Sequence, residues 1–191
     1  MPRKQISIYG DWEEGYAMDL HTLSSEYLGD DEYGRPIFNT IRSELGELLY
    51  KLKYRHDRSI INDIIKLISP FVIQWTKSLN IDVIISMPPS NKNRTYQPVD
   101  VIAEQLAETL RIQYFKDFLI KNTDIESKNL NDKSVISNSM TRTKRFLKKV
   151  NVLLIDDLYK SGASMNEAVR VLKEDKNINN IYVLALTKTR T

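Results

Sequence analysis

The sequence predicts an α/β fold, in which helices flank a mostly parallel β-sheet. Three short apolar runs rich in β-branched residues have the length of buried strands: residues 82–87, 152–155 and 181–186. Segments with helical spacing of apolar residues lie between them. Strands that alternate with helices favour a parallel sheet, and a right-handed crossover would set the strand at 181–186 beside the strand at 152–155. With 191 residues, the chain fits one domain with a small appendage.

The first 40 residues are predicted to form that appendage. Residues 5–9 alternate between polar and apolar, and residues 16–20 can pair with them across a glycine-containing turn region. A polar, turn-rich stretch follows at 29–36. We therefore expect a hairpin or hood over the functional site at 1–40, and the α/β domain at 41–191.

Helices are predicted before and after the strand at 82–87. Asn39 is a suitable N-cap for a helix whose core face is Ile41, Leu45, Leu48, Leu49 and Leu52. Two more helices are expected at 58–67 and from Pro70 to residue 79. Pro98 opens a further helix, residues 112–115 form a short second strand, and residues 140–149 are expected to form a basic helix.

The stretch at 150–173 carries the strongest functional signal. Its apolar run stops at two adjacent carboxylates, Asp156 and Asp157. A loop of small and polar residues then leads into an amphipathic helix; the loop consists of Lys160, Ser161, Gly162, Ala163 and Ser164. The N–H groups of such a loop and the helix dipole bind anions. The carboxylates can hold ribose hydroxyls or Mg²⁺, which prefers hard oxygen ligands.

A plain turn is the alternative interpretation of this loop. Gly162 is the only glycine after Gly46, and it would ease a turn as well as a close approach to phosphate. Ser164 and Glu167 fit the S-x-x-E capping box of a helix N-terminus. A cap and an anion site use the same N–H groups, so the residues alone leave both interpretations open.

A second loop follows the strand at 82–87 and contains Pro88, Pro89, Ser90 and Asn91. Proline cannot continue a central ladder, so this loop marks the carboxyl end of the strand, where open α/β sheets bind ligands. Residues 121–139 are polar and rich in Asn, Ser and Lys, which predicts a mobile segment.

Composition excludes several classes of site and of protein. The chain has no cysteine and two histidines, which excludes disulfides, thiolate metal sites and His-rich metal sites. The formal net charge of +3 is too small to argue for nucleic-acid binding by itself. No apolar stretch approaches the length of about 20 residues that spans a bilayer, and the N-terminus lacks the apolar segment of a secretory signal. We expect no membrane partner and a cytoplasmic location.

The segment LLIDDLYKSGASMNEA resembles the phosphoribosyl-diphosphate (PRPP) binding signature of type I phosphoribosyltransferases, and most closely that of the ComF-like group. The resemblance implies a type I phosphoribosyltransferase-like fold. It implies that Asp156 and Asp157 hold the ribose hydroxyls, directly or through Mg²⁺, and that the loop at 160–164 wraps the 5′-phosphate. Lys160 departs from the threonine or aspartate that is usual there, and the N-terminal zinc ribbon that ComF-like proteins often carry is absent.

Two other segments resemble the same group. Residues 85–105 are similar to a pattern V-P-x-P…R…G-F-N-Q, with Arg94 and Tyr96 at the arginine and aromatic positions on the acceptor or diphosphate side. The loop at 88–91 then corresponds to the diphosphate loop. The segment LGELLYKLKYRHDRS resembles the region before the catalytic sheet. There Lys53 or Arg55 could face a phosphate, or could complement the dipole at the helix C-terminus.

The resemblance implies a pentosyltransferase of nucleotide metabolism that transfers a 5-phosphoribosyl group from PRPP to an unidentified nitrogen acceptor and releases diphosphate. Mg²⁺ is the expected cofactor, PRPP or a related ribose phosphate the expected ligand, and a homodimer the common assembly of such enzymes. Two alternatives stay open: a non-catalytic sensor of PRPP or nucleotides, and a ComF-like DNA-uptake factor. The second has internal support only from the basic residues at 142–149.

Overall fold

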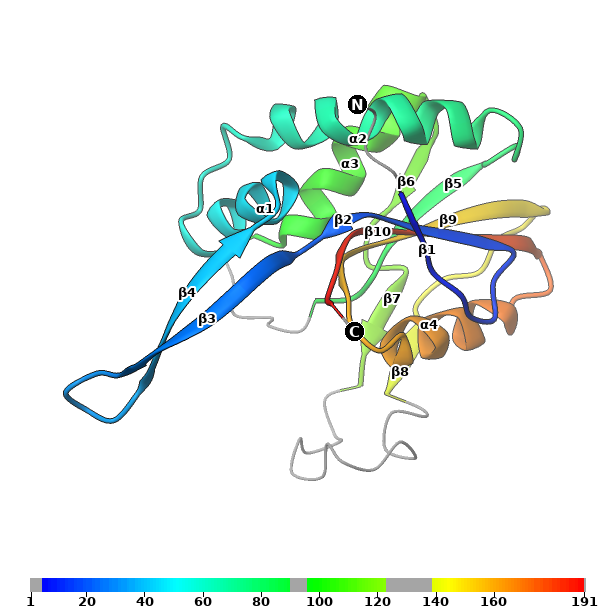
Figure 1. The fold of residues 1–191 in the computed structure, drawn as a ribbon. Coiled ribbons are helices and arrows are strands. Elements are labelled where there is room, and N and C mark those ends of the chain that lie inside the picture. Colours follow the sequence, from blue (N-terminus) through cyan, green and yellow to red (C-terminus); the bar gives the residue numbers. More distant parts are fainter. Residues whose placement is uncertain (1–4, 90–95, 123–138, 191) are drawn as a thin grey trace.

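A central six-stranded sheet organises the molecule (Figure 1). The computed structural model describes residues 5–89, 96–122 and 139–190. In spatial order the strands are β1 (Ile6–Ser7), β2 (Glu14–Leu20), β10 (Ile178–Lys188), β9 (Val150–Tyr159), β5 (Val83–Ser86) and β6 (Gln113–Phe115). All neighbouring pairs are parallel except β1 with β2. The predicted α/β fold with a mostly parallel sheet is therefore confirmed.

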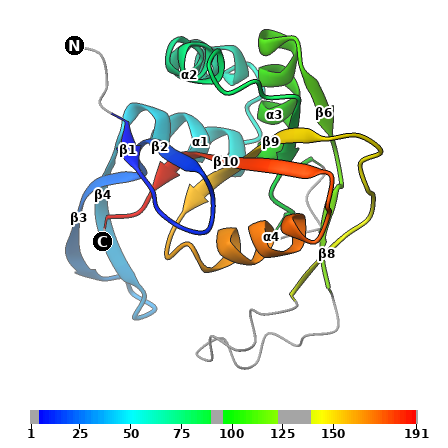
Figure 2. The ribbon, with the colours of Figure 1, turned by 90° about the vertical axis from the view of Figure 1, so that its right-hand side faces the viewer.

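Helices cover both faces of the sheet (Figures 1 and 2). On one face lie α1 (Glu44–Tyr54), α2 (Ile61–Thr76) and α3 (Pro98–Leu110), and on the other lies α4 (Ala163–Lys173). Successive side chains of a strand point to opposite faces, so β9 serves both cores. Val152 and Leu154 pack in the core that contains α4, whereas Leu153 and Ile155 pack in the core under α1, α2 and α3.

Two antiparallel ribbons extend beyond the sheet. β3 (Thr22–Asp30) and β4 (Pro36–Arg42) form a long hairpin that projects from the body of the molecule (Figure 1). β7 (Leu119–Lys121) pairs with β8 (Met140–Arg142) in a separate two-stranded ribbon. The predicted pairing of residues 5–9 with 16–20 is confirmed, but both strands belong to the main sheet. The boundary expected at residue 40 falls inside β4, and the division into hood and domain stays a prediction.

The first helix begins later than predicted. Asn39 lies in β4, opposite Glu26, and Ile41 is 54% exposed on the hairpin rather than buried on a helix. The N-cap is Ser43, whose Oγ accepts a hydrogen bond from the N–H of Gly46 at 3.0 Å. Both residues are favourable caps, and pairing between β3 and β4 extends the strand past the first of them.

Pro70 does not separate two helices, as predicted, but lies inside the single helix α2. A proline removes one helical hydrogen bond and crowds the preceding turn, which costs about 3 kcal/mol or more. The apolar face of α2 runs unbroken on both sides of it, with Ile64, Ile68 and Val72 fully buried. This burial outweighs the local cost, so the helix continues.

Residues 140–149 do not form the predicted basic helix. Their first three residues form β8, and the remainder is irregular up to the start of β9. Phe146 explains the difference, because its ring stacks on Phe118 at a centroid distance of 4.8 Å. Its N–H donates to Asp175 and its carbonyl accepts from Asn177. These tertiary bonds fix the backbone outside a helical conformation.

Among the residues described, no helix combines the length and the apolar character needed to cross a membrane.

Candidate functional site

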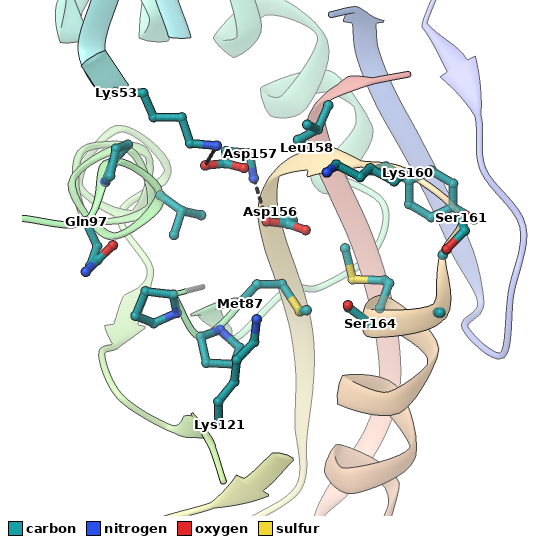
Figure 3. Close-up of a pocket in the computed structure, with 18 of the residues that line it drawn as sticks. Lys53, Met87, Gln97, Lys121, Asp156, Asp157, Leu158, Lys160, Ser161 and Ser164 are labelled. Atoms are coloured by element: carbon teal, nitrogen blue, oxygen red, sulfur yellow. Dashed lines mark hydrogen bonds and ion pairs between the residues drawn. The ribbon is translucent and has the colours of Figure 1, made fainter. Parts of the chain in front are cut away.

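A pocket of about 470 Å³ opens at the carboxyl ends of β5 and β9 (Figure 3). The last turn of α1 borders it on one side and the N-terminus of α4 on the other. It is lined by Lys53, Tyr54, Met87, Pro88, Pro89, Gln97, Pro98, Val99, Lys121, Asp156, Asp157, Leu158, Tyr159, Lys160, Ser161, Gly162, Ala163, Ser164 and Met165. The structure thus gathers both predicted acids, the whole predicted anion loop and the two prolines around one cavity.

The acid pair lies within a strand rather than after it. The predicted strand was expected to stop at Asp156, but β9 continues to Tyr159, because β10 pairs with it along this length. Adjacent residues of a strand point to opposite faces. Asp156 therefore continues the row of Val152 and Leu154 on the α4 side, and Asp157 faces the layer of α1.

Asp157 is held by three contacts. One of its carboxylate oxygens lies 2.7 Å from the Lys53 ammonium. Its N–H donates to the Asp156 carboxylate at 2.8 Å, and its carbonyl accepts from the Thr187 hydroxyl at 3.0 Å. His21 stands behind this group, with Nδ1 at 3.1 Å from the same hydroxyl. The side chain and the backbone of Asp157 are therefore both fixed.

Asp156 is the carboxyl group with the most perturbed proton affinity at the site. Burial and the neighbouring charge of Asp157 raise its pKa to about 7. The hydrogen bond from the N–H of Asp157 and the positive charges of Lys53 and Lys121 act in the opposite direction and limit the rise. Burial of Lys121 lowers the pKa of its own ammonium group, and the nearby charge of Asp156 partly offsets this. Near neutral pH this carboxyl group can either donate a hydrogen bond or accept one.

Gly162 allows the tight turn of the loop at 160–164. Its φ of +79° is in the left-handed region, and a β-carbon there would collide with the Tyr159 hydroxyl. α4 begins at Ala163 with Gly162 as N-cap, so the predicted capping box of Ser164 and Glu167 is wrong. Glu167 binds Arg170 instead, at 2.9 Å. The first N–H groups of a helix have no partner within the helix, and the first residues of α4 line the pocket, where such groups can meet an anion.

An N-terminal loop braces this region from outside. Trp12 packs edge-on against Tyr159 at 6.5 Å, and the N–H of Asp11 donates to Asn166 of α4. The carboxylate of Asp11 also pairs with Lys173 at 2.7 Å. No role could be predicted for these residues, because nothing in their spacing connects them with a segment 155 positions later.

Two lysines at the pocket were not assigned to the site from sequence. Lys53 had two interpretations, and its ammonium points into the pocket and pairs with Asp157 (Figure 3). Lys121, at the end of β7, was included in the polar segment predicted to be mobile. The pattern around Lys53 was a usable signal, whereas Lys121 reaches the pocket through a strand pairing that the sequence did not reveal.

The residues that the resemblance assigns to the acceptor or diphosphate side lie partly within the described ranges. Ser90, Asn91 and Arg94 lie outside the described residues, as does most of the segment predicted to be mobile. Tyr96 does not line the pocket, because its hydroxyl donates to the carbonyl of Leu52 in α1. Its ring lies under the Arg58 guanidinium at 4.2 Å.

The donor set fits magnesium bound together with a phosphate ligand. Within the described ranges, no group of three or more His, Cys, Asp or Glu side chains is arranged to hold a metal ion. Two adjacent carboxylates nevertheless offer hard oxygens, and Mg²⁺ is usually bound by one or two carboxylates plus substrate phosphates. Asp156 and Asp157 therefore offer oxygens to an ion whose remaining ligands come from a phosphate, and they form no metal cage.

Comparison with solved structures identifies proteins with a similar fold. No protein-family model and no curated protein sequence matches the chain. Among solved structures, adenine phosphoribosyltransferase from Saccharomyces cerevisiae, complexed with an imino-altritol bisphosphate and adenine, has 11% identity and a TM-score of 0.53, over 87% of this chain and 85% of that one. The enzyme from Thermoanaerobacter pseudethanolicus has 12% identity and a TM-score of 0.45, over 86% and 95%. The yeast structure therefore shows a similar α/β fold.

Proposed function

We propose that the chain is a PRPP-dependent phosphoribosyltransferase related to the ComF-like group. It would transfer a 5-phosphoribosyl group to a nitrogen acceptor and release diphosphate. The observation that carries the proposal is the meeting of an acid pair and a helix N-terminus across one pocket, which matches the two ends of a ribose phosphate. The volume of about 470 Å³ suits a ligand of this size.

Each part of the pocket has a chemical task in this proposal. The N–H groups of the loop at 160–164 and the first turn of α4 bind the 5′-phosphate. Asp156 and Asp157 accept hydrogen bonds from the ribose hydroxyls, and Pro88 and Pro89 border the diphosphate. Magnesium, when bound, would neutralise part of the charge on the diphosphate.

The reaction needs little covalent chemistry from the protein. The bond from C1 of the ribose to the diphosphate oxygen breaks, with the electron pair leaving on diphosphate. The acceptor nitrogen forms the new bond to C1 and releases its proton to water. Because C1 becomes cationic and the diphosphate departs as an anion, catalysis rests on positioning the reactants and on neutralising the departing diphosphate.

Binding and turnover test the proposal separately. Millimolar PRPP with Mg²⁺ is expected to raise the melting temperature, and Asp157→Asn is expected to lose this shift. Lys66→Gln on the exposed side of α2 is the matched control, since its side chain is 78% exposed. Release of diphosphate is then measured with nucleobases and amines as acceptors. An unchanged melting curve at millimolar PRPP would refute the assignment.

A non-catalytic sensor of PRPP or nucleotides is the second candidate. Lys160 favours the sensor, because type I phosphoribosyltransferases usually have threonine or aspartate at this position. Lys160 also lines the pocket. A sensor would show the same thermal shift with PRPP and no release of diphosphate with any acceptor. Lys160→Thr would then leave turnover absent, whereas in an enzyme it would change the rate.

Other expectations from the sequence accompany the proposal. A homodimer is tested by light scattering, a cytoplasmic location by fractionation, and the hood role of the N-terminal 40 residues by deleting the tip of the β3–β4 hairpin. A DNA-uptake role keeps the basic residues at 142–149 as its support, although they do not form a helix. DNA affinity that falls steeply with salt would favour it.

A further inference from the structure

A positive charge of the protein already stands at one of the two carboxylates. The Lys53 ammonium lies 2.7 Å from the Asp157 carboxylate, and the side chains are 20% and 17% exposed. A charge pair with this little exposure is poorly screened by salt. We propose that Lys53 is a tethered counter-cation, which competes with divalent metal ions for Asp157 until a phosphate ligand arrives. The inference rests on the proposed function, because it concerns the metal at that same site.

The position of Lys53 is set by the packing of α1. Leu49 and Leu52, one turn apart on the buried face near the end of the helix, are 1% and 0% exposed. The carbonyl of Leu52 also accepts the hydrogen bond from Tyr96. The helix end is thus anchored from two sides, and its lysine reaches the pocket by side-chain extension alone (Figure 3).

The two faces of β9 explain why Lys53 forms an ion pair with Asp157 and not with Asp156. Asp157 faces the layer of α1, whereas Asp156 faces the layer of α4. Lys53 therefore meets Asp157 directly and affects Asp156 only through space. A metal ion that used both carboxylates would have to approach an ammonium group already bound to one of them.

This competition favours an order of binding. A bare divalent cation meets repulsion from Lys53 and gains only the carboxylates. A cation that arrives with diphosphate brings oxygens to which the Lys53 ammonium can move, so the repulsion becomes an attraction. The metal would therefore enter with its phosphate ligand and bind weakly by itself.

The affinity for Mn²⁺ alone, titrated by electron paramagnetic resonance without any phosphate, tests this order. Lys53→Met is expected to bind Mn²⁺ roughly tenfold more tightly than the unmodified chain, which corresponds to about 1.4 kcal/mol. Lys53→Arg keeps the charge and is expected to bind as weakly as the unmodified chain. Lys66→Met removes an exposed lysine of α2 and should change nothing. Asp157→Asn combined with Lys53→Met should abolish the gain.

Circular dichroism verifies that each variant is folded, and Lys53→Gln replaces Lys53→Met if the latter is not. Equal or weaker Mn²⁺ binding after removal of the charge overturns the proposal, and so does an absence of Mn²⁺ binding in every variant. A merely structural salt bridge predicts a loss of affinity on substitution, not a gain. Because no PRPP is added, the result is independent of whether PRPP raises the melting temperature.

Discussion

The hydroxyl of Tyr159 fills the space that a β-carbon on Gly162 would need, which ties the end of β9 to the start of α4. Gly162→Ala is expected to lower the free energy of unfolding by roughly 2–3 kcal/mol, from a left-handed backbone and from displacement of the tyrosine ring. Urea unfolding measures the loss, and the melting shift caused by PRPP should shrink with it.

Gly34→Ala is the matched control for this prediction. Gly34 has a φ of +71°, close to that of Gly162, but a β-carbon there meets open space. It should lose only the backbone contribution of about 1 kcal/mol. Equal losses of unfolding free energy in the two variants would show that the contact between Tyr159 and position 162 does not contribute to the loss.

The pH dependence of stability should carry the signature of Asp156. Its pKa is raised to about 7 in the folded protein, mainly by burial, from an ordinary value of 3.8. The folded state therefore binds more protons than the unfolded state between those values, and stability falls as pH rises from about 4 to 7. A pKa shift corresponds to at most about 1.4 kcal/mol of stability per pKa unit. Because the carboxyl group borders the pocket and its water, we expect a smaller loss of unfolding free energy, roughly 2 kcal/mol over this pH range.

Asp156→Asn removes this titration. Urea unfolding at several pH values should give a difference between variant and unmodified chain that grows up to about pH 7 and then stays level. Ser25→Ala, on the β3–β4 hairpin, removes no titratable group, so it serves as control and should give a constant difference. A constant difference for Asp156→Asn as well would contradict the raised pKa.

The irregular segment before β9 depends on Asp175. Its carboxylate accepts from the N–H of Phe146 at 2.9 Å and pairs with Arg142 at 3.1 Å, and the Asp175 side chain is 4% exposed. Asp175→Ala leaves that guanidinium with an uncompensated buried charge, which should cost about 3–5 kcal/mol. Glu174→Ala, in an exposed pair with Arg170, should cost less than about 1 kcal/mol. Thermal and urea unfolding measure both losses. Similar losses in the two variants would contradict a special role of Asp175 in stabilising the segment before β9.

Pro70→Ala is expected to stabilise the protein. Pro70 is exposed and lies inside α2, where alanine restores a helical N–H group. The gain should be about 1–2 kcal/mol, after the loss of the restriction that proline places on the unfolded chain. Pro98→Ala, at the first turn of α3, removes a proline from a favourable position and should not stabilise. A neutral or negative effect at position 70 would indicate that α2 has adapted to its proline.

The sequence was informative where the signal is local. The apolar runs that became β5, β9 and β10 are continuous, and loops at strand ends follow from the fold class, so the pocket edge was predictable. The start of α1 was not, since Asn39 and Ser43 are both good caps and only the pairing of β4 with β3 decides between them. The contact between Lys53 and Asp157 joins residues that are 104 positions apart, and only a three-dimensional structure reveals it.

The continuation of β9 to Tyr159 has a consequence for how this site can change. The spacing of the two carboxylates is set by the pleat of one strand, which β10 holds in register beyond them. Substitutions in either core will alter what each carboxylate faces and leave their separation unchanged. One helical layer can therefore be changed around Asp157, and the other around Asp156, while the strand keeps the two backbone positions at a fixed distance.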